Sequence, residues 1–120
     1  MRLFVLALIA GSGFTAFAGS AVAEITIQLP VDASVDHIRV SYDCGGQSMT
    51  VEYVNAGPVS LAVFSHEGEP VVAANVIAAS GARYAGGRFV WWTKGQAGSL
   101  YDIAEGGNAE PIAECREEKS

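Results

Sequence analysis

The residues of this chain best suited to chemistry lie between positions 80 and 95, which read SGARYAGGRFVWWTKG. Ser80 carries a hydroxyl that can donate and accept hydrogen bonds, and Lys94 carries a compact ammonium group on a flexible stem. Together they could bind carboxylates or, as nucleophile and base, attack a carbonyl. Either chemistry requires that two residues far apart in the sequence lie close together in the fold.

A glycine pair between these residues predicts how they meet. Gly86 and Gly87 are predicted to form the two-residue loop of a β-hairpin, because glycine readily adopts the positive φ of primed turns. In this register Ser80 faces Thr93, so Ser80 and Lys94 emerge together at the open end of the hairpin. A slip of one or two residues would change which faces are shared but would leave the two residues at the same end.

The elements that must hold this hairpin are strands. Apolar and polar residues alternate with a period of two at positions 38–44, 49–53 and 59–63, and turn-forming residues separate these runs. The pattern predicts an all-β fold, a small closed antiparallel meander barrel that protects its own edges. Residues 24–37, which Pro30 interrupts, are predicted to form an additional strand and a connector.

The first 23 residues have the pattern of a secretory signal peptide. Arg2 gives a positive start, residues 3–10 are apolar, and Ala21-Val22-Ala23 resembles a cleavage site. The apolar run is too short for a spanning helix, and no cysteine lies near the cleavage site to suggest a lipoprotein. We therefore expect cleavage after Ala23, export to the periplasm without a stable membrane anchor, and a single domain over residues 24–120.

The two cysteines, Cys44 and Cys115, both lie in the predicted mature region. An exported chain with two cysteines most simply pairs them, and closing so long a loop would stabilise the fold by roughly 4 kcal/mol. A domain of this size has only a modest hydrophobic core, so such a crosslink is expected to matter.

The charge balance indicates the kind of partner. The chain carries 13 acidic and 7 basic residues, and Arg2 is the one basic residue of the predicted leader, so the mature region has a net charge of −7. Nucleic acid is excluded as a partner because its binding depends on cationic contacts to phosphate. A basic protein is compatible with this charge. His37 and His66 lack metal-ligand spacing and are expected at the surface, so neither a metal nor a cofactor is predicted.

Five motifs in order resemble the bacterial C-type lysozyme inhibitors, the MliC/PliC group. The resemblance covers residues 42–115, most of the predicted mature chain. Its motifs are Tyr42-Asp43-Cys44, Val51-Glu52-Tyr53-Val54-Asn55, the SGARY stretch at 80–84, the WWTKG stretch at 91–95 and the closing Cys115. The chain departs from the family pattern at Gln96 and Gly98, where the family often has an acidic residue and an alanine.

The resemblance implies an eight-stranded antiparallel barrel that inhibits C-type lysozyme by inserting a loop pair into its active-site cleft. Ser80 and Lys94 would contact the lysozyme, and Gly81 and Gly95 would allow a close backbone approach. Tyr84 and Thr93 complete the implied lysozyme-binding set. The consecutive Trp91 and Trp92 must face opposite sides of a strand, so one is expected in the core and the other at the exposed end or the partner.

Two other classes of function remain open from the residues alone. Ser80 and Lys94 could form a Ser-Lys hydrolase dyad, although the mature region contains neither GxSxG nor SxxK and has little room for a substrate cleft. A small periplasmic barrel could also bind an apolar ligand inside, although the many branched and aromatic residues favour a filled interior. The inhibitor interpretation predicts no enzymatic activity.

Overall fold

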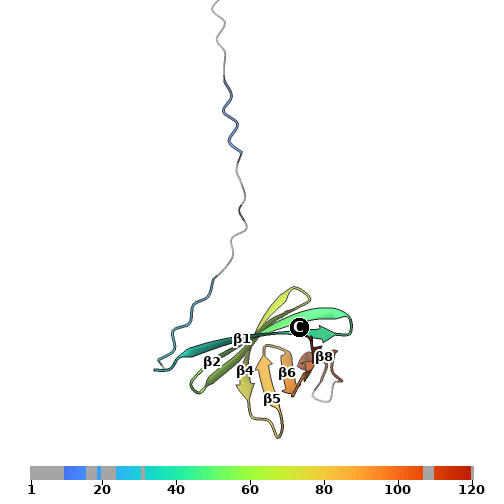
Figure 1. The fold of residues 1–120 in the computed structure, drawn as a ribbon. Helices are drawn as coiled ribbons and strands as arrows, with labels where there is room; N and C mark the ends of the chain where they lie inside the picture. Colours follow the sequence, from blue (N-terminus) through green and yellow to red (C-terminus); the bar gives the residue numbers. More distant parts are fainter. Residues whose placement is uncertain (1–9, 16–18, 20–23, 31, 107–109, 120) are drawn as a thin grey trace, which may run out of the picture.

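The computed structural model describes residues 10–15, 19, 24–30, 32–106 and 110–119. Within them, eight strands follow one another along the chain, and a single 3-10 turn, Ile103–Glu105, follows the seventh (Figure 1). The strands are β1 Val35–Cys44, β2 Gln47–Ala56, β3 Val59–His66, β4 Glu69–Val76, β5 Ala82–Gly86, β6 Phe89–Lys94, β7 Ala97–Asp102 and β8 Ala113–Glu117.

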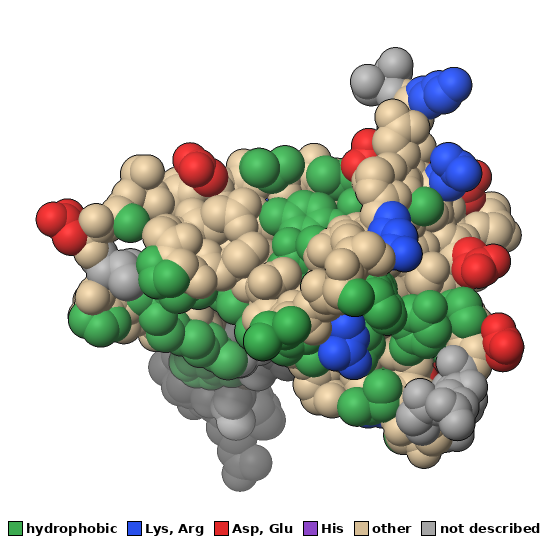
Figure 2. Space-filling model, turned by 90° about the horizontal axis from the view of Figure 1, so that it is seen from below, with side chains coloured by type: hydrophobic (Ala, Val, Ile, Leu, Met, Phe, Trp, Pro, Cys, Tyr) green, Lys and Arg blue, Asp and Glu red, His purple; other side chains and the backbone are tan. Residues whose placement is uncertain are grey.

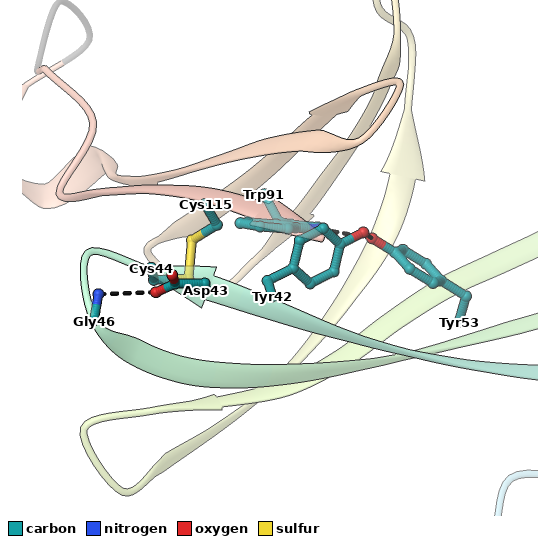
Figure 3. Close-up of a disulfide and its surroundings, with 7 residues drawn as sticks. All are labelled: Tyr42, Asp43, Cys44, Gly46, Tyr53, Trp91 and Cys115. Atoms are coloured by element: carbon teal, nitrogen blue, oxygen red, sulfur yellow. Dashed lines mark hydrogen bonds between the residues drawn. A yellow bond between two sulfur atoms is a disulfide. The ribbon is translucent and has the colours of Figure 1, made fainter. Parts of the chain in front are cut away.

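The strands form a closed antiparallel barrel in which each strand pairs with its neighbours in sequence and β1 also pairs with β8. This confirms the predicted all-β meander barrel. The closing seam is short, since Tyr42 pairs with Glu117 and Asp43 pairs with Arg116. The disulfide between Cys44 and Cys115 continues the seam, with an S–S distance of 2.02 Å, and confirms the predicted pairing (Figure 3). A covalent bond therefore reinforces the part of the ring with the fewest backbone pairs.

Large side chains fill the inside of the barrel. Trp91, Leu100 and Val51 are fully buried there, and Phe64 and Phe89 pack in the same cluster. Such filling is expected of an eight-stranded barrel, whose interior is just wide enough for side chains. The apolar residues thus form a packed core, as their abundance predicted.

A short chain of hydrogen bonds crosses this core. The Trp91 indole donates to the Tyr53 hydroxyl at 2.9 Å, and the Tyr53 and Tyr42 hydroxyls are 2.7 Å apart (Figure 3). The Tyr42 ring also meets the Trp91 ring edge-on, with centroids 5.1 Å apart. The polar atoms of three aromatic residues are therefore paired with one another, which removes the penalty of burying them alone.

In β3 the face with the most apolar residues is not the face that points into the barrel. Val59, Leu61 and Val63 share one face as predicted, but they are half-buried on the outside of the barrel. Ala62 and Phe64 are the buried residues of this strand. Both faces of β3 are apolar, so composition does not reveal which face lies inward.

The additional strand predicted within residues 24–37 is wrong for residues 24–30 and 32–34, which form no strand. Ile25 and Ile27 are 84% and 71% exposed, and regular pairing begins at Val35. The reason is that a strand needs a partner edge, and the closed ring pairs β1 with both β2 and β8.

The predicted hairpin register is also shifted. The two-residue loop contains Gly87 and Arg88 rather than Gly86 and Gly87, because Gly86 pairs with Phe89. A Cβ on Gly86 would overlap the Val72 carbonyl oxygen, so this glycine permits close strand approach, whereas Gly87 supplies the positive φ of +57°. The shift is two residues, an even number, so every side chain keeps its predicted face.

The predicted leader lies mostly outside the described residues. Of positions 1–23 the structure describes 10–15 and 19, which are exposed and belong to no helix or strand. In the described part of the chain no helix has the length and apolar character needed to cross a bilayer.

Candidate functional site

Ser80 and Lys94 lie at the same end of the barrel, as predicted. Ser80 belongs to the connection 77–81 between β4 and β5, and Lys94 is the last residue of β6 before a two-residue turn. Because Ala82 pairs with Thr93, these two segments run side by side. Both candidate side chains are exposed. In Figure 1 the β4–β5 connection is at the bottom, and Figure 2 views the molecule from that side, where a row of basic side chains runs from the upper right edge toward the lower centre.

Gly81 brings the two segments into direct contact. A Cβ at this position would overlap the Thr93 carbonyl oxygen and come within 2.8 Å of the Lys94 Cγ atom. The residue also has a φ of +67°, a conformation that side-chain-bearing residues rarely adopt. No other residue fits here without moving β6, so glycine at position 81 places Ser80 beside Lys94.

Trp92 connects the same two residues from the outer face of β6. Its indole N–H donates to the Ser80 carbonyl oxygen at 2.9 Å. The Lys94 Nζ atom lies 5.9 Å from the centroid of the Trp92 ring, within the range of a cation–π contact. Trp91, by contrast, points inward and is fully buried. The sequence placed the two tryptophans on opposite faces, but it did not assign the outer role to Trp92.

Arg83 joins this group as a second cation. Its guanidinium carbon lies 5.8 Å from the Trp92 ring centroid, and its backbone pairs with that of Trp92. In the described part of the chain no carboxylate lies within ion-pair distance of Arg83, and its close side-chain partner is this aromatic ring.

Within the described ranges, the cations of this end are not ion-paired, whereas two other arginines of the barrel are. Arg39 and Arg88 are neutralised by nearby carboxylates; for example, Arg88 lies 3.3 Å from Asp102. Among the described residues, neither Lys94 nor Arg83 forms an ion pair. The site therefore presents two positive charges that are available to an anionic partner, on a molecule whose net charge is negative.

The other predicted site residues support the loops from behind. Tyr84 is buried, with 7% exposure, and its ring lies 5.6 Å from that of Tyr53. Thr93 is half-buried, and its hydroxyl donates to the Ala82 carbonyl oxygen at 3.4 Å. Gly95 opens the turn after Lys94 with a φ of +55°. The geometry thus gives Ser80 and Lys94 the exposed polar groups, with these residues beneath and beside them.

The hollow at the site is small: Trp92 and Lys94 line a space of about 260 Å³ together with Ala97, Ser99 and Tyr101. A hollow of about 880 Å³ lies among the β1–β2 turn, the β3–β4 turn and residues 110–114, and its lining includes neither Ser80 nor Lys94. No cluster of three or more His, Cys, Asp or Glu side chains within the described ranges could hold a metal ion. His37 is exposed and bonds Glu52 at 2.8 Å, and the half-buried His66 meets Phe89 edge-on.

Comparison with known proteins identifies the family. The family described as membrane-bound lysozyme-inhibitor of c-type lysozyme matches residues 42–109, more than half of the chain. The chain belongs to this family. The matched segment contains Ser80, Lys94 and Trp92, so the site described above lies within the family's own region.

Two relatives carry the same description, membrane-bound lysozyme inhibitor of C-type lysozyme. The one from Cupriavidus necator is 48% identical over 79 residues, 64% of this chain and 63% of the relative. The one from Pseudomonas aeruginosa is 43% identical over 93 residues, 76% of this chain and 73% of the relative. The match thus spans slightly less than two thirds of the first relative. The description of these family members as membrane-bound is consistent with an exported protein.

A solved structure of the family has the same fold. The crystal structure of Pseudomonas aeruginosa MliC in complex with hen egg white lysozyme superposes with a TM-score of 0.69 and 38% sequence identity. The alignment covers 82% of this chain and 99% of that chain.

Proposed function

We propose that this protein inhibits C-type lysozymes by presenting Ser80 and Lys94 to the lysozyme active-site cleft. The observation that carries the proposal is the convergence of these exposed residues around Trp92, at an end of the barrel where neither Lys94 nor Arg83 forms an ion pair among the described residues. Family membership supports it, since the relatives are described as lysozyme inhibitors and MliC was crystallised with a C-type lysozyme. In this function the protein is a binding partner, not an enzyme.

The chemistry of lysozyme explains why an ammonium group would inhibit it. The enzyme uses two carboxyl groups, one held protonated as a general acid and one ionised. The Lys94 ammonium between them would form charge-assisted hydrogen bonds and occupy the position of the substrate. A nearby positive charge also favours ionisation of a carboxylic acid, which removes the proton that the acid must donate. The Ser80 hydroxyl can donate a further hydrogen bond to a carboxylate.

Supporting residues complete the proposed contact. Gly81 and Gly95 hold the two loops in positive-φ conformations that let the backbone approach a cleft closely. Thr93 lies at the edge of the contact, and Tyr84 supports the β5 strand from inside the barrel. Of the two departures from the family pattern, Gln96 lies in the turn after Lys94 and is expected to tune its shape, whereas Gly98 lies in β7 against the Trp91 ring.

Substitution of the two contact residues tests the proposal. Lys94→Ala should weaken lysozyme inhibition by roughly 2–5 kcal/mol, the range for truncating one partner of a desolvated charge pair. Its melting temperature should hardly change, because an exposed lysine contributes at most about 1 kcal/mol to stability. Ser80→Ala should weaken inhibition by about 1–3 kcal/mol, through one lost hydrogen bond to a charged group.

Inhibition constants measure the loss of lysozyme binding in these variants, and thermal melts check that their folds are intact. Lys94→Arg is the matched control, since it keeps the charge and changes the donor geometry, and it should recover only part of the inhibition. The double variant should lose less than the two single losses combined, because both side chains enter one cleft. A Lys94→Ala protein that inhibits as strongly as wild type would reject the proposed contact.

We also propose that the protein acts in the periplasm after cleavage behind Ala23, as a mature domain of residues 24–120. The mass of the protein isolated from the producing cell should correspond to a chain that begins at Glu24. A mass that retains the first 23 residues would reject the cleavage.

A further inference from the structure

We infer that Trp92 is a positioning residue that holds Ser80 and Lys94 in their binding arrangement before the lysozyme arrives. This inference rests on the proposed function and extends it to a residue whose side chain need not touch the partner. It follows from the way one indole ring contacts both loops of the site.

The first contact fixes the β4–β5 connection. The connection 77–81 is exposed for the most part, and Ile77 is 97% exposed, so little packing orders it. The indole hydrogen bond to the Ser80 carbonyl ties this loop to β6. Because the bond is to the backbone of Ser80, it leaves the hydroxyl available for another partner. No second side-chain hydrogen bond reaches residues 77–81 within the described part of the chain.

The second contact orders the lysine. Lys94 follows Trp92 by two residues on the same strand, so both side chains stand on the outer face of β6. An exposed lysine samples many rotamers, and ordering one on binding weakens association. The Trp92 ring beside the Lys94 side chain reduces the number of rotamers that the lysine samples before binding. It does so through cation–π attraction to the ammonium group and packing against the methylene groups.

Gly81 makes the two contacts interdependent. The Lys94 Cγ atom lies close to Gly81, next to the residue whose carbonyl accepts the indole hydrogen bond. The loop, the lysine stem and the ring thus form one packed unit. If the ring is lost, the loop and the lysine should both become mobile.

Two variants separate this role from simple packing. Trp92→Phe keeps an aromatic face but removes the N–H donor, and Trp92→Leu removes both. We expect inhibition of a C-type lysozyme to weaken about 2- to 12-fold for Trp92→Phe, the effect of leaving one flexible group unordered, and further for Trp92→Leu. Val63→Ala is the control, since it truncates a half-buried side chain on the outer face of β3, which pairs with β2 and β4 and not with the strands of the site. It should change inhibition by no more than about two-fold.

NMR of the protein without lysozyme supplies a readout that does not depend on inhibition. In wild type the Trp92 indole proton should exchange slowly, and the Lys94 methylene protons should show upfield shifts from the ring. Trp92→Phe should lose the first signal and keep part of the second, whereas Trp92→Leu should lose both. Ordinary Lys94 shifts together with a freely exchanging indole proton in wild type would overturn the inference.

The same set of measurements distinguishes failure of the inference from failure of the proposed function. If wild type inhibits lysozyme and Trp92→Leu inhibits equally well, the positioning role is wrong and the inhibitor function stands. If wild type shows both NMR signatures and does not inhibit, the proposed function is wrong, while the ordering of the two loops by Trp92 is supported as a property of the fold.

Discussion

At the scale of single residues, folding alters the ionisation of two phenols that share a hydrogen bond, Tyr42 and Tyr53. Burial raises the pKa of Tyr42 far above its usual range, and its hydrogen bond with Tyr53 adds to this effect. Burial also raises the pKa of Tyr53. Both hydroxyls lie on the hydrogen-bonded chain that ends at Trp91, so the folded protein holds them neutral.

The expected consequence is a loss of stability in alkaline solution. In the unfolded chain Tyr42 ionises near its ordinary pKa of 10.0, whereas in the folded chain it stays protonated. Because the folded pKa is raised, the stabilisation is complete below pH 10 and is lost as the pH rises above it. Tyr42→Phe should therefore lose less of its free energy of unfolding than wild type between pH 8 and pH 11.

Denaturant titrations at the two pH values measure this difference. Tyr101→Phe, which alters a half-buried tyrosine outside the hydrogen-bonded chain, is the control and should follow wild type. If Tyr42→Phe and wild type lose the same free energy of unfolding, ionisation of the Tyr42 hydroxyl does not cause the loss of stability at alkaline pH.

At the scale of strands, Gly98 in β7 leaves room for the ring of Trp91 from β6 because it has no side chain. A Cβ there would overlap the Trp91 ring and lie 3.1 Å from its Cζ3 atom. The ring is fully buried and cannot move aside easily. The departure from the family pattern at this position is therefore a matter of core packing in this chain.

Gly98→Ala should destabilise the barrel by about 1–3 kcal/mol, the usual effect of overfilling a packed core. The double variant with Trp91→Phe should be more stable than the two single effects predict, because a smaller ring leaves room for the methyl group. Equilibrium unfolding of the three variants tests this coupling. Strictly additive effects would indicate that the methyl group and the ring do not compete for space.

Some features of the strands can be predicted from the sequence and others cannot. Period-two alternation and turn residues are sufficient to predict the all-β meander and the site end of the hairpin, but they also predicted a strand within residues 24–37 that is absent at 24–30 and 32–34. The sequence does not predict the exact register of β5 and β6. Gly86 and Gly87 are both able to form the turn, and only a contact with Val72 distinguishes them. The choice between Trp91 and Trp92 likewise depends on which face of β6 closes inward, a property of the complete ring.

At the scale of the whole molecule, the charge and the site have opposite signs. The net charge of the predicted mature region is −7, whereas the candidate site presents Lys94 and Arg83 without acidic partners in the described part of the chain. In the proposed function, a negative molecule attracts a basic lysozyme at long range, and the local cations then meet the carboxylates of the cleft.

Long-range attraction by the net charge and short-range contacts of the local cations should respond differently to salt. Between low and physiological ionic strength the association rate with a basic C-type lysozyme should fall, because salt screens long-range attraction. The dissociation rate should change less, since contacts inside a cleft are shielded from ions. Surface plasmon resonance or stopped-flow measurements give both rates. An association rate that is independent of salt would assign the negative charge to solubility alone.

The short seam between β1 and β8 also bears on the order in which the parts of the fold form. The first and last strands meet there, so a growing chain cannot complete its ring until β8 has formed. A chain that stops before Ala113 has two unpaired edges, β1 and β7, and open edges favour aggregation. The hairpin that bears Lys94 forms from neighbouring residues and needs no such delay. The binding end of the molecule can therefore take shape before the barrel that supports it is closed.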